Sequence, residues 1–105
     1  MTQLTIKNAA TALATVSTEF VVLFQHGTMK VEYYKPDQID KQSPHRQDEL
    51  YVIASGSGTF YNDGARTPFN TGDVLFVAAG KEHRFENFTA DFATWVIFYG
   101  QDGGE

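Results

Sequence analysis

Three side chains of this 105-residue chain, two imidazoles and one carboxylate, could act together as a chemical site. The segment SPHRQDELYVIASGSG, residues 43–58, carries His45 and Glu49 and continues into an apolar run. If this segment is an extended strand, alternate residues share a face, so Gln47 and Tyr51 lie on the same side as the two ionisable groups. A face that changes from polar to apolar along one strand predicts the mouth and the packed floor of a small barrel.

A carboxylate and an imidazole inside a barrel destabilise the fold unless they are paired or bind a cation. His83, which begins the later segment HRFEN, residues 83–87, offers a partner. Two imidazoles and one carboxylate form a set of three metal ligands that leaves positions open for water or substrate. The sequence therefore predicts a metal site of His45, Glu49 and His83. A metal-free, hydrogen-bonded cluster of the same three residues is the alternative.

Residues that share a face with these ligands are expected to line a pocket. Tyr51 and Phe85 lie deeper on the two faces, and Asn87 follows on the face of the second histidine. In the segment TMKVEYYK, residues 28–35, one of the two adjacent tyrosines is expected to face inward and to reach a ligand. We assign Tyr33 to the pocket together with the other three residues.

The elements that must position these groups are short strands joined by glycine-rich turns. A short helix is expected first, over residues 9–14 with Asn8 as its cap. Strands are expected over residues 19–25, 28–35, 45–54, 59–62, 66–69, 74–77, 83–87 and 91–100. About eight strands at this spacing favour an all-β fold, either a β-barrel or a double-sheet jelly roll.

The same pattern divides the chain into an N-terminal segment, residues 1–18, one barrel domain, residues 19–100, and a frayed tail, residues 101–105. His26 falls in a turn between two strands and is expected to be exposed. The last strand is apolar on both of its faces between residues 92 and 99. Its outer face needs a cover, either the N-terminal segment or a second subunit, and we expect a homodimer.

Composition and charge argue against several classes of partner. The chain has 8 Lys and Arg residues against 13 Asp and Glu residues, a net charge of −5, which disfavours nucleic acid and anionic membranes. It contains no cysteine, so thiolate metal ligands and disulfides are excluded. We find neither an apolar run of membrane-spanning length nor a secretory signal, and expect a cytoplasmic protein with a small-molecule ligand.

A regular spacing of glycines surrounds the second histidine: Gly72, Gly80, His83 and Asn87 are separated by seven, two and three residues. This spacing resembles the second conserved motif of the cupin family, with Ala78 standing where the family usually has proline. The resemblance extends, with the flanking strands, over nearly the whole chain.

The first cupin motif is matched in part. Three residues separate His45 from Glu49, and six separate Glu49 from Gly56, as in the family. His45 takes the place of the second histidine of the motif. Ser43 stands in the place of the first histidine, and Asp37 stands in the place of the opening glycine.

The resemblance implies a cupin jelly-roll barrel, also called a double-stranded β-helix, that is usually dimeric and holds a divalent metal. Carried over by position, the ligands are His45, Glu49 and His83. The first histidine of the family is missing, so Gln47 is a further candidate, either as an oxygen ligand or as a partner of a bound water. Ser43 is the other candidate at that place.

Imidazole and carboxylate ligands suit Fe, Mn, Zn and Ni alike, so the identity of the metal stays open. The resemblance implies that the protein binds or converts a small metabolite, with oxygenase or isomerase chemistry if it is an enzyme. The alternative is a non-catalytic module that binds a sugar-like molecule and has a vestigial or absent metal site.

Overall fold

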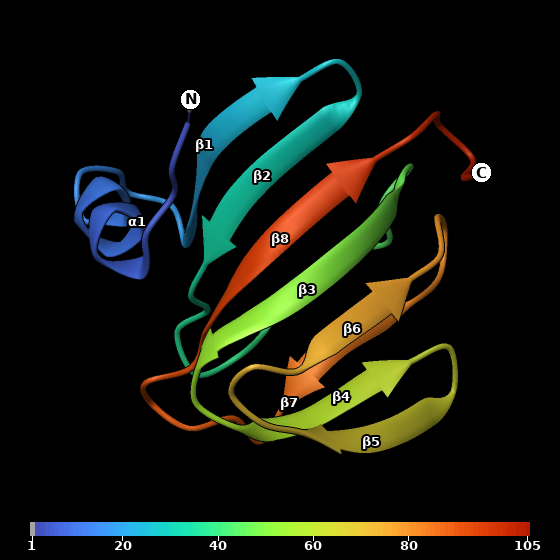
Figure 1. Ribbon diagram of the computed structural model, residues 1–105. Helices are drawn as coiled ribbons and strands as arrows, with labels where there is room; N and C mark the ends of the chain where they lie inside the picture. The colour runs from blue at the N-terminus through green and yellow to red at the C-terminus, as the bar shows by residue number, and fades with distance from the viewer. Residues whose placement is uncertain (1) are drawn as a thin grey trace.

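The computed structural model describes residues 2–105 as one short helix and two antiparallel sheets (Figure 1). The larger sheet has the strand order β1-β2-β8-β3-β6, and the smaller sheet has the order β5-β4-β7. The elements are α1 (Ile6–Leu13), β1 (Phe20–His26), β2 (Met29–Tyr34), β3 (Asp48–Ser55), β4 (Gly58–Asn62), β5 (Ala65–Phe69), β6 (Val74–Val77), β7 (His83–Glu86) and β8 (Ala93–Tyr99). The expected all-β jelly-roll barrel with a short N-terminal helix is confirmed.

The main core fills the space between the two sheets and is mostly aromatic. Tyr51 of β3 packs edge-on against Phe60 of β4 and Phe85 of β7, with ring centres 5.7 and 4.8 Å apart. Such edge-on pairs place the positive edge of one ring against the negative face of another. The buried residues of this core are Tyr34, Tyr51, Ile53, Phe60, Phe69, Val77, Phe85, Phe92, Val96 and Phe98.

Helix α1 begins earlier than the sequence predicted. The N-cap is Thr5, whose side-chain oxygen accepts a hydrogen bond from the backbone N–H of Asn8 at 3.1 Å. The helix packs on the outer face of the larger sheet through a second small core centred on Ala9, Tyr33 and Ala93. Capping by Asn8 was therefore wrong, because Thr5 offers its hydroxyl one turn earlier.

Strand β3 begins at Asp48, so His45 and Gln47 lie before it, in the connection that follows β2. The backbone bends at Arg46 and Gln47 because its hydrogen bonds there go to loops. The N–H of Gly80 donates to the carbonyl of His45 at 2.8 Å, and the N–H of Gly103 donates to that of Arg46 at 2.7 Å. The expected continuous strand from residue 45 was therefore wrong.

The C-terminal tail is fastened to the barrel rather than frayed. The N–H of Glu105 donates to the Asp48 carboxylate at 3.1 Å, in addition to the bond between Gly103 and Arg46. His26 ends β1 and is exposed, as expected. Across residues 2–105, we find no helix with the length and apolarity needed to cross a membrane.

Candidate metal centre

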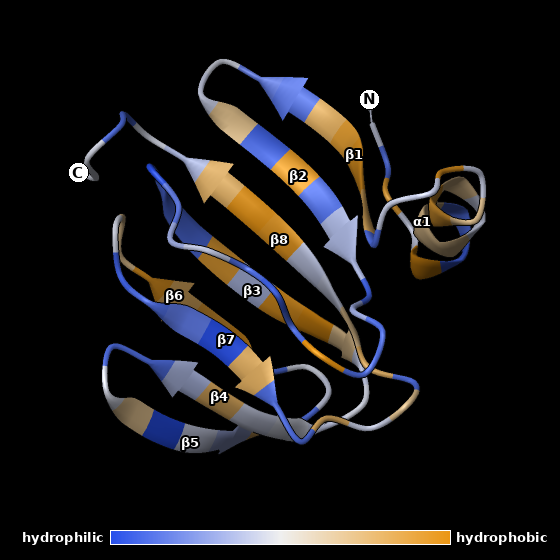
Figure 2. Ribbon diagram, turned by 180° about the vertical axis from the view of Figure 1, so that it is seen from behind, coloured by the Kyte–Doolittle hydropathy of each residue, from blue (hydrophilic) through white to orange (hydrophobic). Residues whose placement is uncertain are grey.

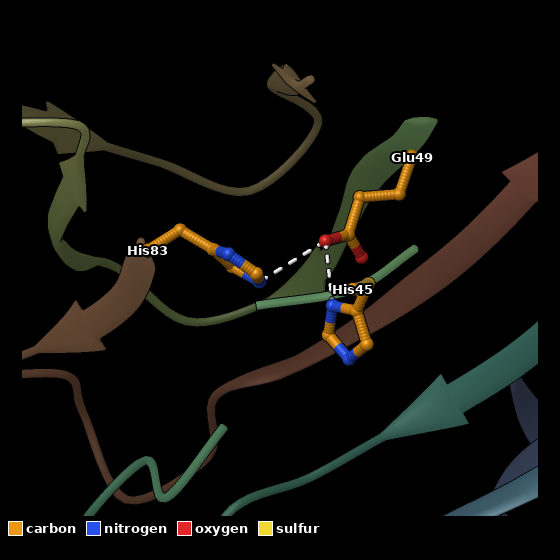
Figure 3. A group of neighbouring side chains, drawn as sticks. All are labelled: His45, Glu49 and His83. Atoms are coloured by element: carbon orange, nitrogen blue, oxygen red, sulfur yellow. Dashed lines mark hydrogen bonds and ion pairs between the residues drawn. The ribbon is translucent and has the colours of Figure 1, made fainter. Parts of the chain in front are cut away.

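The structure brings His45, Glu49 and His83 together inside the barrel (Figure 3). Oxygen Oε1 of Glu49 lies 2.9 Å from Nδ1 of His45 and 3.0 Å from Nε2 of His83. One potential ligand atom from each residue lies within 4.8 Å of the other two. The three residues that the sequence singled out thus form one cluster.

The three side chains come from three different parts of the fold. Glu49 is on β3, directly opposite Phe98 of β8 and Val77 of β6. His83 opens β7 opposite Asn62 of β4, so it enters the cluster from the smaller sheet. His45 comes from the bend before β3, and its ring packs edge-on against Phe98 at 4.9 Å. The two sheets and one loop therefore meet at this cluster.

The two motif segments are also tied to each other by their backbones. Besides the bond from Gly80 to His45, the Asp48 carboxylate accepts the N–H of Ala79 at 2.9 Å. The loop that leads to His83 is thus held against the segment that carries His45 and Glu49. The same Asp48 carboxylate holds the tail through Glu105.

Burial and charge set the protonation of the cluster. Glu49 is completely buried and His83 is 2% exposed, whereas the His45 side chain is 31% exposed. Burial alone would raise the pKa of Glu49, but the hydrogen bond to His45 and the nearby His83 ring outweigh it and lower that pKa. Burial opposes the charge on His83 as well, yet the nearby Glu49 carboxylate and the hydrogen bond to the Lys81 carbonyl raise its pKa.

The hydrogen bonding of His83 tests whether the cluster fits a metal ion. Its Nδ1 lies 2.9 Å from the Lys81 carbonyl, which can only accept, so Nδ1 carries a proton. In the neutral ring, Nε2 then presents a lone pair to the Glu49 carboxylate, which also carries only lone pairs. Within residues 2–105, neither His83 Nε2 nor Glu49 Oε2 has a partner with hydrogen-bond geometry, although Nε2 lies at ion-pair distance from Oε1.

Two facing acceptors are stable only with a cation between them, either a proton or a metal ion. Two ligands at right angles, each about 2.1 Å from a metal, are themselves about 3.0 Å apart. The separation of Nε2 and Oε1 is 3.0 Å. The donor set, and the spacing of its Glu49 and His83 atoms, therefore fit a divalent metal ion, with His45 as the third candidate ligand.

A cavity of about 550 Å³ adjoins the cluster on the side of His45. Lys30, Glu32 and Tyr34 line it from the inner face of β2, and Val96 and Phe98 line it from β8. Burial raises the pKa of the Glu32 carboxyl, and Lys30 offsets part of that effect. The partly exposed ring of His45 is the member of the cluster that faces this space.

The connection from β2 to β3 crosses the inner side of the larger sheet and closes part of the barrel (Figure 2). The Asp40 carboxylate anchors it, accepting the Tyr34 hydroxyl at 2.6 Å and the backbone N–H of Phe85 at 2.8 Å. Gln42 accepts the Tyr51 hydroxyl at 2.9 Å. The connection therefore bonds to strands of both sheets, and its later part, residues 41–43, lines the cavity.

Some of the other expected site residues lie next to the cluster or the cavity, and others lie elsewhere. Tyr51 and Phe85 are buried in the core next to the cluster, and the Tyr51 ring centre lies 6.1 Å from that of His83. Ser43 is exposed and lines the cavity. Gln47 donates to the carbonyls of Thr28 and Gly100, at 3.0 and 2.8 Å. The Gln47 amide is thus held outside the cluster, and its expected role in place of the missing histidine was wrong.

Two pocket assignments were also wrong. Asn87 is exposed, and its backbone is left-handed, with a φ of 50°, so the alternation of β7 ends before it. Tyr33 faces the helix side of the sheet, where its ring packs edge-on against Trp95 at 5.3 Å. Its neighbour Tyr34 faces the cavity instead. Glu32, two residues before Tyr34 on the same face of β2, also lines the cavity and was not predicted.

Comparisons with known proteins agree with this architecture. Residues 30–99 match the family model of the cupin domain. An uncharacterized protein of Streptomyces coelicolor is 31% identical over 81 residues, which are 75% of this chain and 77% of that protein.

Two further matches are more limited. An oxalate-binding protein of Thermotoga maritima is 41% identical over 39 residues, 37% of this chain and 32% of that protein. The crystal structure of a cupin 2 conserved barrel domain protein from Salinispora arenicola has a TM-score of 0.64 and 20% identity, covering 77% of this chain and 74% of that one. At this identity, the structural likeness supports the fold alone.

Proposed function

Because this chain belongs to the cupin family, we propose that it binds a divalent metal ion through His45, Glu49 and His83. In this proposal the metal holds a small, oxygen-bearing metabolite in the adjoining cavity. The observation that carries the proposal is the buried pair of acceptors, His83 Nε2 and Glu49 Oε1, which face each other at 3.0 Å without hydrogen-bond geometry. The Thermotoga maritima relative named for oxalate binding supports an oxygen ligand of this kind.

Each residue of the cluster has its own role in this proposal. When bound, a divalent ion would supply Lewis acidity toward a ligand oxygen. Glu49 contributes the negative charge that favours a cation inside the barrel. The Lys81 carbonyl fixes the Nδ1–H tautomer of His83 and so leaves Nε2 free to bind a metal. His45 links the cluster to the cavity, because it is the ligand that lines that space.

A second candidate function is a non-catalytic module for a sugar-like ligand, with a vestigial metal site. It is favoured by the hydrogen bond between His45 and Glu49 at 2.9 Å, which can exist without metal, and by Ser43 in the place of the first histidine. The two candidates differ in one measurable property, namely whether ligand binding requires the metal ion.

Metal uptake tests the proposal directly. The parent protein and the variants His45→Ala, Glu49→Ala and His83→Ala would be produced without a histidine tag and reconstituted with Fe, Mn, Zn or Ni. We expect about one metal ion per chain in the parent and loss of most of it in each variant, since two remaining ligands compete poorly with water. His26→Ala is the matched control, because His26 is an exposed histidine at the end of β1.

Metal content would be measured by elemental analysis after dialysis, and melting temperature would be measured with and without chelator. A parent that takes up none of the four metals would refute the metal site. Equal metal loss in His26→Ala and His83→Ala would show that uptake is nonspecific.

We also propose a homodimer formed through the outer face of the larger sheet. Helix α1 covers one part of this face, where Trp95 packs in the second core. At the opposite edge, Val74 and Phe76 of β6 are 61% and 50% exposed. Apolar side chains at this level of exposure are typical of surfaces that associate.

A further inference from the structure

We propose that Lys30 and Glu32 form a second subsite of the cavity, which binds a hydroxyl group at the far end of an aliphatic ligand. This inference rests on the proposed function, because the metal centre holds the other end of that ligand. The ligand class it defines is a short hydroxy acid or a sugar-like molecule, with an acidic oxygen at one end and a hydroxyl at the other.

The position of the two residues gives the first argument. Lys30 and Glu32 are two residues apart on β2, so both side chains point to its inner face and line the cavity. The Lys30 ammonium lies 3.3 Å from Glu32 Oε2 and stands over the Phe98 ring, 5.1 Å from its centre. Glu32 is only 8% exposed, and the metal-ligand cluster does not include it. An ion pair of a buried carboxylate and a partly exposed ammonium thus faces a cavity large enough for a small molecule.

The chemistry of the pair gives the second argument. Lysine can only donate hydrogen bonds and an ionised carboxylate can only accept them, whereas a hydroxyl does both. A hydroxyl can therefore bind to both members of the pair at once. A second carboxylate at this place would gain Lys30 but would face the negative charge of Glu32. The pair as a whole is neutral, which also favours a neutral group.

The distance between the two ends gives the third argument. The His45 ring centre and the Lys30 ammonium lie 4.9 and 5.1 Å from the centre of the Phe98 ring, so they are at most about 10 Å apart. A coordination bond of about 2.1 Å at one end and a hydrogen bond of about 2.9 Å at the other then leave at most about 5 Å between the two ends, which limits the ligand to a short carbon chain. Val96 and Phe98 line the cavity between the two ends and provide an apolar wall for its methylene groups.

Three probe molecules test the subsite. Butyrate and 4-hydroxybutyrate carry the same carboxylate and differ by one remote hydroxyl, and succinate has a second carboxylate in place of the terminal hydroxymethyl group. Metal content is measured first, and the metal-loaded parent is then titrated with each probe by calorimetry. We expect 4-hydroxybutyrate to bind about tenfold more tightly than butyrate, the effect of one hydrogen bond to a charged group, and more tightly than succinate.

Variants then test whether Lys30 and Glu32 cause the preference for 4-hydroxybutyrate. In Glu32→Ala and Lys30→Met, the preference for 4-hydroxybutyrate over butyrate should fall to less than about twofold, while metal content stays unchanged. Lys41→Met is the matched control, because Lys41 lines the same cavity but is exposed and lies outside the pair. It should keep the tenfold preference.

The outcomes separate the two proposals. A metal-loaded parent that binds 4-hydroxybutyrate and butyrate equally, or binds succinate most tightly, overturns the hydroxyl subsite and leaves the metal centre standing. A parent without metal overturns the proposed function, and with it the anchor on which the subsite depends. A preference that survives in Glu32→Ala and Lys30→Met assigns it to other residues and overturns the inference. The comparison of the three probes in the parent remains decisive even if a variant fails to fold.

Discussion

Replacing Glu49 by glutamine should separate metal binding from folding stability. The Glu49 carboxylate faces Nε2 of His83 and Nδ1 of His45 at 3.0 and 2.9 Å. A glutamine amide of the same shape has two N–H donors in place of one carboxylate oxygen. Those donors can reach both ring nitrogens, so the unpaired acceptor of His83 gains a partner.

The expected magnitudes follow from burial. Glu49 is completely buried, and replacing a buried charge by a neutral, hydrogen-bonded group is often neutral or stabilising. We therefore expect the free energy of unfolding of metal-free Glu49→Gln to equal or exceed that of the parent. Glu49→Ala leaves the histidines without that partner and should lose about 1 to 3 kcal/mol for the stranded polar groups alone. Metal affinity should fall more than about 100-fold in both variants, because changes outside the ligand set already cost about 10- to 100-fold.

Urea unfolding of the metal-free proteins at pH 7.5 measures the first effect, and metal titration followed by calorimetry measures the second. The decisive result is the contrast between the two variants. If Glu49→Gln is destabilised as much as Glu49→Ala, the carboxylate stabilises the fold as an ion and the cluster is structural. If Glu49→Gln keeps the metal, Glu49 is not a ligand.

Three further predictions concern pH, positioning and assembly. The raised pKa of His83 and the lowered pKa of Glu49 mean that their ion pair stabilises the metal-free protein most between about pH 4.5 and 6.5. That contribution is lost as pH rises through the His83 pKa, where a metal ion can replace the proton. The increase in melting temperature on adding metal should therefore grow from pH 6 to pH 8. An increase that stays constant over this range would contradict the prediction. Asp48→Ala should weaken metal binding by about 10- to 100-fold, because the Asp48 carboxylate holds the loop before His83. Asp91→Ala is the control and should leave the affinity unchanged, because Asp91 is exposed and lies outside that loop. Equal affinities of Asp48→Ala and the parent in calorimetry would contradict the prediction. Phe76→Ser should shift a dimeric parent toward monomer in sedimentation at micromolar concentration, and a monomeric parent refutes the dimer.

Local sequence signals predicted most of the fold because they agree with its tertiary structure. The strands expected at 59–62, 66–69 and 74–77 match β4, β5 and β6 to within one residue. The turn between β4 and β5 has left-handed φ angles of 50° at Asp63 and 95° at Gly64, as the Asp-Gly pair predicts for a tight hairpin. Pro68 lies on β5, an edge strand, where a missing N–H donor is tolerated.

The site was predicted less completely, because its details depend on long-range contacts. The three clustered residues were identified from their chemistry and spacing. The choice between Tyr33 and Tyr34 could not be made locally, because the contact of α1 with the outer face of β2 decides which tyrosine faces the helix. The left-handed backbone of Asn87 likewise has no unambiguous local signal. Glu32 was missed because a charged residue on a strand is more often solvated than buried.

The bend before β3 explains why Gln47 does not share the face of His45 and Glu49, although strand alternation predicted that it would, and why those two residues still come together. A regular strand would place residues 45, 47 and 49 in one row, about 6.5 Å apart. The bend instead brings Nδ1 of His45 to 2.9 Å from Glu49 and turns the Gln47 amide away to Thr28 and Gly100. The same bend presents the carbonyls of His45 and Arg46 to Gly80 and Gly103.

Those carbonyl contacts connect the ligand geometry to the rest of the barrel. Asp48 and Glu49, adjacent on β3, point to opposite faces, so one carboxylate fastens the loop before β7 while the other enters the ligand cluster. The segment 45–49 thus supplies two of the three ligand side chains and also the contacts that fix the loop leading to the third. A change that straightened this segment would move His45, release the loop before His83 and expose Glu49 together, so the metal centre should be lost as a unit.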